Sequence, residues 1–433
     1  MSASPTPPAS SAAPVVVIVD SYGLSKIVSD EFQKRGAVMV RVQSTPEVPA
    51  AYRGAFDLSE YADNIIHRGD LDETARAVAA HRPVAVVAGG EIGVELADAL
   101  SERLGLPTNG TELSAARRDK YVMVETVKRA GVSGAHQLLV HDQAELSAWH
   151  EEFGGRIVLK PLRSAAGNGV FFCDTPEQSA AAFARISGQE NVFSERNDGA
   201  VAQEYLRGTE YMVNTVSRDG VHRVCEIWRT TRITANGVAD LSDTVYLMPR
   251  RGPVQERLTE YAGQVLDALG ILHGPAHVEI KLTASGPVLV EMGARVCGAN
   301  LPYYAQLAHG TSQLDWTAEA YLNPEGFLAT HADETPEGRF CAFVGLVSPV
   351  AGTLVGYRGL EALRELESFA DMRVYAQPGG RIARTVDDLT YPAVVVLMHD
   401  SEETVLRDAN TIRYLDGPSF YDVTPDAEAV PAP

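Results

Sequence analysis

The sequence predicts an α/β protein in which strands and helices alternate along the chain. Two segments carry this prediction, because each joins a short apolar run to a stretch whose apolar residues recur at helical spacing. They are residues 15–36 and residues 83–105. Such alternation is typical of a parallel sheet with helices packed on its faces. The length of 433 residues is a third observation, since it predicts two to three domains.

Three strands are expected in the N-terminal part of the chain, at residues 15–19, 37–42 and 83–88, and the stretch between the second and third strands shows no clear pattern. Ligands of parallel sheets bind beyond the carboxyl ends of the strands. Those ends carry Tyr22-Gly23 and Gly89-Gly90-Glu91. Tight turns alone explain both sequences equally well.

The composition excludes several classes of function. A formal net charge of −20 argues against a nucleic-acid partner, because such binding draws on clustered Lys and Arg. The longest apolar runs are too short to span a membrane. The four cysteines show no C-x-x-C pair, so neither a zinc site nor a disulfide framework is indicated. Residues 1–13 lack the charged and apolar regions of a signal and are expected to be a disordered tail, so we expect a cytoplasmic protein.

The most informative stretch is residues 157–172, in which one apolar run ends at Lys160, a loop of small residues follows, and a second apolar run leaves it. This pattern predicts a strand, a turn and a strand. Gly167 and Gly169 allow backbone N–H groups to face an anion, Ser164 adds a hydroxyl, and Lys160 supplies a positive charge. An ordinary hairpin turn is the alternative. The loop is not a Walker A sequence, because the lysine precedes the glycines.

Two further segments suit a nucleotide. Asp119-Lys120 opens a predicted helix, where a lysine is usually solvated surface. Residues 201–214 form two strand-like runs whose connection is flanked by Glu204 and Glu210. An extended connection can pair with the edge of a purine, and a following carboxylate can accept both ribose hydroxyls. A hairpin with surface acids is the alternative.

Two carboxylates lie on adjacent predicted strands, Glu279 on one and Glu291 on the next, each among apolar neighbours. Buried carboxylates are normally paired or bound to a metal. The pair suits Mg²⁺, which takes a few carboxylates and completes its shell with substrate phosphates. Arg295 follows and can grip a phosphate or a carboxylate. A structural salt bridge from either acid to Lys281 or Arg295 is the alternative.

Taken in order, these elements resemble the ATP-grasp superfamily, and within it the carboxylate–amine ligases of the L-amino acid ligase type. The resemblance covers about residues 15–325 and implies a three-part α/β architecture. It comprises a tail (1–13), an N-terminal parallel α/β domain (14–118), a lid subdomain (119–208) and a C-terminal α+β grasp domain with an appended α/β region (209–433). In the appended region, residues 340–344, 372–376 and 392–399 have strand patterns, and residues 424–433 are expected to be a loose tail.

The resemblance also implies roles for individual residues. Lys120 and Lys160 would contact the ATP phosphates, with Lys160 and Arg295 as the catalytic pair. The loop with Ser164, Gly167 and Gly169 would close over the phosphates as a lid. Glu204 and Leu206 would meet the adenine through backbone atoms, and Glu210 would bind the ribose. Glu279 and Glu291 would hold Mg²⁺, or Mn²⁺ in its place. One departure is Gly293, where many superfamily members have an asparagine that acts as a third metal ligand.

The implied reaction activates an amino acid carboxylate as an acyl phosphate and joins it to an amine, with a second amino acid as the first choice of amine. Residues 298–300, which follow Arg295, are expected to line the substrate pocket together with the Tyr22 loop and residues 243–246. The alternatives are an ATP-grasp carboxylase that uses bicarbonate, and a non-catalytic ATP-binding module. The expected partners are small-molecule amino acids, and the resemblance admits a homodimer.

Overall fold

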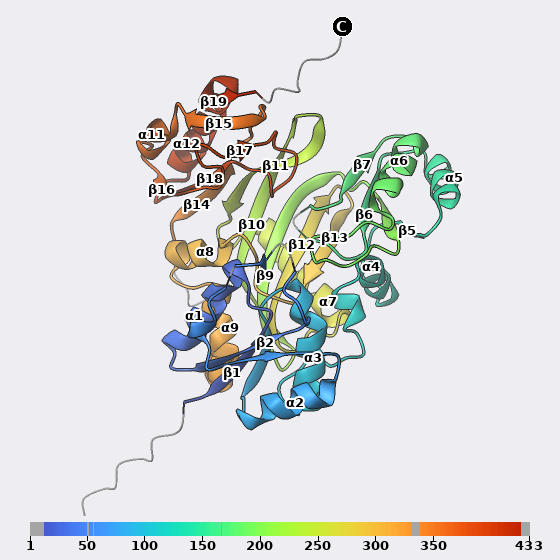
Figure 1. Ribbon diagram of the computed structural model, residues 1–433, viewed down its shortest axis with the longest axis vertical. Coiled ribbons are helices and arrows are strands. Elements are labelled where there is room, and N and C mark those ends of the chain that lie inside the picture. Colours follow the sequence, from blue (N-terminus) through green and yellow to red (C-terminus); the bar gives the residue numbers. More distant parts are fainter. Residues whose placement is uncertain (1–12, 50–51, 55, 166, 331–337, 426–433) are drawn as a thin grey trace, which may run out of the picture.

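The computed structural model describes residues 13–49, 52–54, 56–165, 167–330 and 338–425. The two expected loose tails lie almost entirely outside the described residues. Figure 1 shows the N-terminal unit in blue, a smaller teal and green unit, and an orange and red C-terminal region, which are arranged around a central sheet. Within the described residues, no helix combines the length and the apolar character that a membrane span requires.

The N-terminal unit is a four-stranded parallel sheet, as predicted. Its strands are β1 (Val15–Val19), β2 (Val38–Gln43), β3 (Asp63–Ile66) and β4 (Ala85–Ala88), in the spatial order β3-β2-β1-β4. The helices are α1 (Lys26–Lys34), α2 (Leu71–Ala80) and α3 (Val94–Arg103). β3 and α2 occupy the stretch for which the sequence showed no clear pattern. The carboxyl ends of β1 and β4 are adjacent, so Tyr22 and Glu91 follow neighbouring strands.

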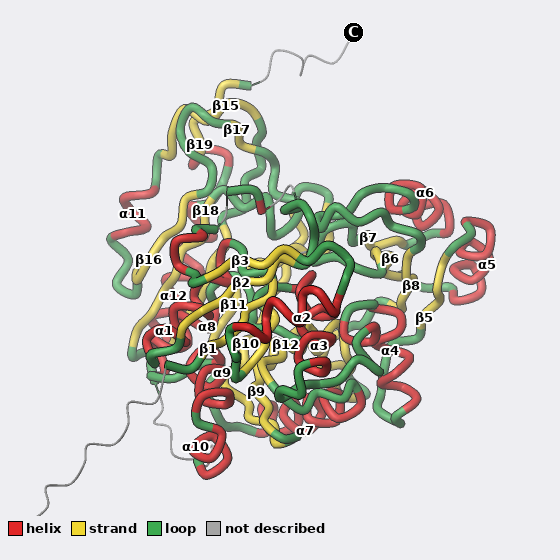
Figure 2. Tube along the Cα trace, turned by 60° about the horizontal axis from the view of Figure 1, so that its bottom comes forward, coloured by secondary structure: helices red, strands yellow, loops and turns green. Residues whose placement is uncertain are grey.

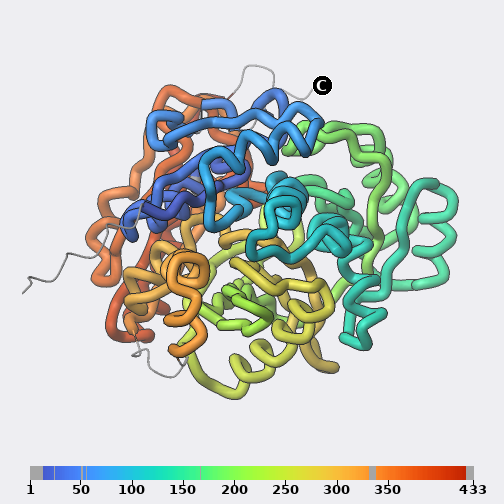
Figure 3. Tube along the Cα trace, turned by 90° about the horizontal axis from the view of Figure 1, so that it is seen from below, coloured from blue at the N-terminus to red at the C-terminus, as the bar shows by residue number. Residues whose placement is uncertain are grey.

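The smaller unit is an antiparallel sheet in the order β5-β8-β6-β7. It consists of β5 (Gln137–Val140), β6 (Ile157–Pro161), β7 (Phe171–Cys173) and β8 (Ala200–Glu204), with α5 (Gln143–Phe153) and α6 (Pro176–Ile186). The helix α4 (Lys120–Arg129) leads into it. Seen from below, α5 and α6 lie on the opposite side of the molecule from the orange C-terminal region (Figure 3).

The central sheet begins with five strands: β9 (Gly208–Arg218), β10 (Val221–Ala235), β11 (Val238–Leu247), β12 (Gly274–Thr283) and β13 (Gly286–Gly293). The C-terminal strands β14 (Phe340–Gly345), β16 (Phe369–Val374) and β18 (Ala393–His399) extend the same sheet to the order β13-β12-β9-β10-β11-β14-β18-β16. The strands of the expected appended α/β region thus continue the central sheet, because β14 pairs with the edge of β11. The strands β15 (Gly352–Tyr357), β17 (Arg381–Ile382) and β19 (Tyr421–Thr424) form a small sheet of their own.

The helices of this half cover the central sheet or lie beside it, as Figure 2 shows. They are α7 (Pro253–Ala268), α8 (Leu301–His309), α9 (Gln313–Leu322), α10 (Pro324–Ala329), α11 (Leu360–Arg364) and α12 (Glu402–Leu415). One apolar core joins β1 and β2 to α4, α7, β9 and β12. The N-terminal sheet is thus packed directly against the central sheet, and residues from both can meet at one site.

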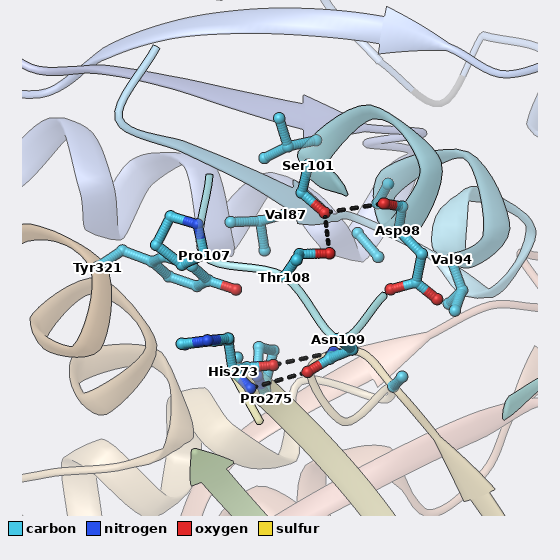
Figure 4. Close-up of a pocket in the computed structure, with 15 residues that line it drawn as sticks. Val87, Val94, Asp98, Ser101, Pro107, Thr108, Asn109, His273, Pro275 and Tyr321 are labelled. Carbon is cyan, nitrogen blue, oxygen red and sulfur yellow. Dashed lines mark hydrogen bonds between the residues drawn. The ribbon is translucent and has the colours of Figure 1, made fainter. Parts of the chain in front are cut away.

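A cavity of about 20 Å³ lies at this contact between the N-terminal unit and β12 (Figure 4). Asn109 closes one side, because its Oδ1 accepts hydrogen bonds of 2.8 Å from the backbone N–H groups of both Leu272 and His273. Ser101 donates a hydrogen bond of 2.8 Å to Thr108 on the other side. A cavity of this size has room for about one water molecule. The substrate site must therefore lie elsewhere.

Candidate active site

The loop after β6 has the backbone that its glycines predict. Gly167 and Gly169 both have φ of +73°, a conformation that strains residues with a side chain. A Cβ on Gly169 would lie 2.8 Å from Cγ of Pro161, whereas a Cβ on Gly167 would meet nothing within 4 Å. Gly169 is therefore required by packing as well as by its φ angle, and Gly167 by its φ angle alone.

The base of this loop is held at several points. Arg163 donates from both Nη atoms to the carboxylate of Glu95 on α3, over 3.0 and 2.8 Å. Asn191 donates to the Arg163 carbonyl (2.9 Å), and the Lys120 ammonium donates to the carbonyl of buried Ser164 (2.9 Å). The loop is thereby tied to the N-terminal unit and to the start of α4.

Lys160 and Lys120, the two lysines predicted to contact phosphate, are both buried and both contact β13. Lys160 is 5% exposed, and its Nζ donates to the Val290 carbonyl over 3.3 Å. Burial lowers the pKa of Lys160 to about 8; Glu291 acts against this effect, and Lys120 adds to it. Lys120 is 3% exposed and forms an ion pair of 2.9 Å with Glu291. The interpretation of Lys120 as solvated surface is therefore wrong.

Glu279 of β12 and Glu291 of β13 face each other directly in the antiparallel register. Like charges at directly opposite positions destabilise a sheet unless something neutralises them, and here Lys120 pairs with Glu291 and His277 with Glu279. The alternative salt bridges do not form: Lys281 pairs with Glu210 at 3.3 Å, and Arg295 pairs with Glu91. The described residues hold no group of three or more potential metal-ligating side chains, so a cation here would need oxygen ligands from elsewhere. Two opposed carboxylates fit Mg²⁺, which takes its other ligands from phosphate and water.

A series of buried polar side chains connects to Glu279, and the sequence prediction missed it. His277 Nε2 lies 3.1 Å from Glu279 Oε1, and its Nδ1 lies 2.8 Å from Asn214 Oδ1. Asn214 donates in turn to Glu226 over 2.9 Å. Burial opposes a charge on His277, but the neighbouring Cys297 and Glu279 raise its pKa to about 10. Burial also opposes ionisation of Glu279, but His277 holds the pKa of that carboxyl below its usual value. The available signal was the two-residue spacing of His277 and Glu279, which places both on one face of a strand.

Glu91 was named in the sequence only as part of a turn, and Arg118 was missed. Arg295 Nε donates to Glu91 Oε2 over 3.0 Å, and Arg118 Nη1 donates to Glu91 Oε1 over 3.1 Å. Burial alone would raise the pKa of Glu91, but Arg295, Arg118 and Lys120 together hold it below its usual value. The turn after β4 thus reaches the residue expected to face the transferred phosphate.

The predicted adenine and ribose residues lie along β8, β9 and their connection. Glu204 ends β8, and its side chain accepts a hydrogen bond of 2.8 Å from the backbone N–H of His136. Leu206 is half-buried in the connection to β9. Glu210 on β9 is buried, with Lys281 and Arg232 as its ionic partners. Their nucleotide roles stay predictions.

The three segments expected to line the substrate pocket differ in their surroundings. Tyr22 is buried and stacks on Tyr52, with ring centroids 5.0 Å apart. Ala299 and Asn300 have φ of 56° and 59°, and such backbone strain is found disproportionately at functional sites. Asp243, in contrast, pairs with Arg413 of α12, which indicates a supporting role for its part of β11.

Comparisons with known proteins agree with this geometry. The family model described as "ATP-grasp domain" matches residues 154–302. Dapdiamide A synthase from Enterobacter agglomerans is 32% identical over 415 residues, which cover 94% of this chain and 96% of the relative. An L-arginine-specific L-amino acid ligase from Bacillus subtilis is 24% identical over 203 residues, or 47% of this chain and 49% of the relative. The alanine–anticapsin ligase of Bacillus subtilis strain 168 is 26% identical over 215 residues, or 46% of each chain.

Among solved structures, the L-amino acid ligase from Bacillus licheniformis has a TM-score of 0.73 and 17% identity, covering 93% of this chain and 97% of that chain. This likeness confirms the predicted α/β fold class. The near full-length match at 32% identity shows the family. The chain belongs to the ATP-grasp superfamily and is an ATP-dependent ligase that joins a carboxylate to an amine.

Proposed function

We propose that this ligase activates an amino acid as an acyl phosphate and transfers the acyl group to a second amino acid, giving a dipeptide or a related amide. The single observation that carries the proposal is the meeting of Lys120 and Lys160 with the opposed pair Glu279 and Glu291, beside Arg295. The names of the relatives support amino acid substrates.

In the first step, a carboxylate oxygen of the acyl substrate attacks the γ-phosphorus of ATP. An O–P bond forms to that oxygen, and the P–O bond to ADP breaks. Phosphoryl transfer needs positioning and charge neutralisation more than covalent help. Lys160 and Lys120 would neutralise the phosphates, and Arg295 would face the transferred group. Glu279 and Glu291 would hold Mg²⁺, which would neutralise phosphate charge when bound.

In the second step, the neutral amine attacks the acyl carbon, a C–N bond forms, and the C–O bond to phosphate breaks. The leaving phosphate can accept the proton that the nitrogen loses. The loop with Ser164, Gly167 and Gly169 would cover the acyl phosphate and exclude water from it. Glu204 and Leu206 would hold the adenine, and Glu210 the ribose.

The test is the release of ADP and phosphate from ATP and Mg²⁺ across a panel of paired amino acids, with mass spectrometry of the products. A parallel arm repeats the assay with Mn²⁺, and another supplies bicarbonate with each single amino acid. We expect ADP release that depends on two amino acids, together with a product of amide mass. Bicarbonate-dependent ADP release without an amide would instead establish a carboxylase, and ATP binding without turnover in any arm would refute the proposed amino acid substrates.

Two further expectations follow from the same proposal. The reaction consumes ATP, so we place it in the cytoplasm. The homodimer stays a prediction, which light scattering during size-exclusion chromatography would test.

A further inference from the structure

The turn after β4 packs against the end of β1 and thereby fixes the backbone of Glu91. A Cβ on Gly89 would lie 2.9 Å from Cγ1 of Ile18, and one on Gly93 would lie 2.6 Å from the Val19 carbonyl oxygen. Glycine at both places lets the turn press directly against the end of β1. Glu91 opens the short 3-10 helix η4 (Glu91–Gly93) between them, so its backbone is held by the N-terminal sheet.

The Glu91 carboxylate lies between two arginines from different parts of the chain. Its side chain is 6% exposed, Arg118 is 1% exposed and Arg295 is 19% exposed. Arg118 directly precedes the predicted helix opening Asp119-Lys120, and Arg295 follows β13. Because a buried charge is costly when its partner is removed, this arrangement ties the N-terminal unit to both phosphate-facing elements.

Three acids stabilise the positive charge of Arg295. Glu91 has the largest effect, followed by Glu291 and Glu279. Arg295 Nε donates a hydrogen bond of 3.0 Å to Glu91, and its Nη1 donates one of 3.2 Å to the Val296 carbonyl. Among these three acids, Glu91 is the one that accepts a hydrogen bond from Arg295, so it is the acid placed to fix the guanidinium.

Gly293 lies beside the ion pair of Glu91 and Arg295 and has no side chain that would contact it. A Cβ at this position would lie 3.0 Å from Glu91 Oε2 and 3.3 Å from Cζ of Arg295. Its φ does not require glycine, because the residue is not among those with positive φ. Glycine at this position therefore leaves room for the ion pair beside it, because a Cβ at these distances would push the carboxylate by a few tenths of an ångström.

We propose that Glu91, supplied by the N-terminal sheet, is the positioning residue for Arg295, and that Gly293 is glycine because the Glu91 carboxylate occupies the space of its side chain. This inference rests on the proposed function, in which Arg295 faces the transferred phosphate. Glu91 itself does not touch the reacting atoms. It acts by holding the guanidinium in one orientation before the substrates bind.

The first test compares Glu91→Gln and Gly293→Ala with the wild type in amino-acid-dependent ADP release. Glu91→Gln keeps the shape and removes the charge, so we expect kcat to fall about 10²-fold, as for the loss of one preorganised charge, with KM for ATP within about twofold. We expect Gly293→Ala to lower kcat in the same way, by about 10-fold or more. Gly263→Ala on α7 is the matched control, because its Cβ would meet nothing within 4 Å, and it should retain wild-type kcat.

A double variant identifies the cause. Adding Gly293→Ala to Glu91→Ala should change kcat less than about twofold, because the carboxylate that the new methyl group displaces is already absent. If Glu91→Ala does not fold, Glu91→Gln and Gly293→Ala alone decide the question. A wild-type kcat in either variant, or a full effect of Gly293→Ala without the carboxylate, would overturn the proposal.

A second measurement does not depend on knowing the amino acids. Calorimetry measures the affinity for ADP and then, with ADP bound, the affinity for inorganic phosphate. We expect Glu91→Gln to weaken phosphate binding about 10-fold and to leave ADP binding unchanged, whereas equal phosphate affinity in both proteins would overturn the proposal. If this result is obtained but no amino acid pair gives turnover, the proposed substrates fail and the role of Glu91 stands.

Discussion

Replacement of Lys160 by methionine should abolish turnover and at the same time stabilise the protein at neutral pH. The ammonium is 5% exposed, and burial lowers its pKa from 10.5 to about 8. That difference corresponds to about 3 kcal/mol of stability that the charged lysine costs below pH 8. Methionine removes this cost but leaves the Val290 carbonyl without its donor, which costs about 1 kcal/mol. The net gain is about 2 kcal/mol.

The gain depends on pH in a direction that thermal unfolding can measure. The folded-state pKa lies below the unfolded value, so the wild type regains stability as the pH rises from about 8 towards 10.5. With about 2.1 cal/mol/K of unfolding entropy per residue, 2 kcal/mol corresponds to roughly 2 °C for this chain. We therefore expect the Lys160→Met midpoint to exceed that of the wild type by roughly 2 °C at pH 7 and by little at pH 10.

Lys120→Met is the matched control, because Lys120 is equally buried but forms an ion pair of 2.9 Å with Glu291 and donates to the Ser164 carbonyl. Its removal leaves Glu291 without this partner, so the midpoint should fall. ADP release should be lost in both variants. A lower midpoint for Lys160→Met than for the wild type at pH 7 would refute the reasoning, since it would mean that nearby acids fully offset the cost of burial.

Five more substitutions test three separate parts of the site. Glu291→Gln should lower kcat about 10²-fold and raise the Mg²⁺ concentration needed for half-maximal ADP release. Gly169→Ala should lower the unfolding midpoint and the affinity for ATP more than Gly167→Ala, because both have φ of +73° but only the first would meet a proline ring, at 2.8 Å. Arg163→Ala should raise KM for ATP several-fold, and Glu95→Ala should do the same. Neither should change the unfolding midpoint by more than about 1 °C, because the Arg163–Glu95 ion pair is partly exposed and such a pair contributes at most about 1 kcal/mol.

Each of these expectations has a clear contrary result. An unchanged Mg²⁺ requirement in Glu291→Gln would remove that residue from the metal site. Equal effects of the two glycine substitutions would show that the φ angle alone governs the loop. A different KM for Arg163→Ala and Glu95→Ala would show that the two side chains do not act as a pair.

Local sequence patterns predicted much of the fold. The alternation of apolar runs and helical spacing identified β1, β2 and β4, and the glycine loop identified β6 and β7. β3 was missed because Asp63–Ile66 is a four-residue strand with two polar residues. α2 carried a usable signal, since Asp70 caps it by accepting a hydrogen bond from the Glu73 N–H. The extension of the central sheet by β14 could not be predicted, because strand pairing across long sequence separations depends on which edges packing leaves free.

The candidate site, like the fold, could be predicted from the sequence only in part. The sequence by itself determined which residue types are present and in what order, and it indicated a loop at Gly167 and Gly169 that suits an anion. Only the tertiary structure decided which cation meets which carboxylate. Lys120 and Glu291 are 171 residues apart, and Arg295 and Glu91 are 204 residues apart. Such pairs depend on how the sheets pack, and no local periodicity encodes that packing. The low pKa of Lys160 has the same origin, because burial is a property of the surrounding atoms and not of the residue itself.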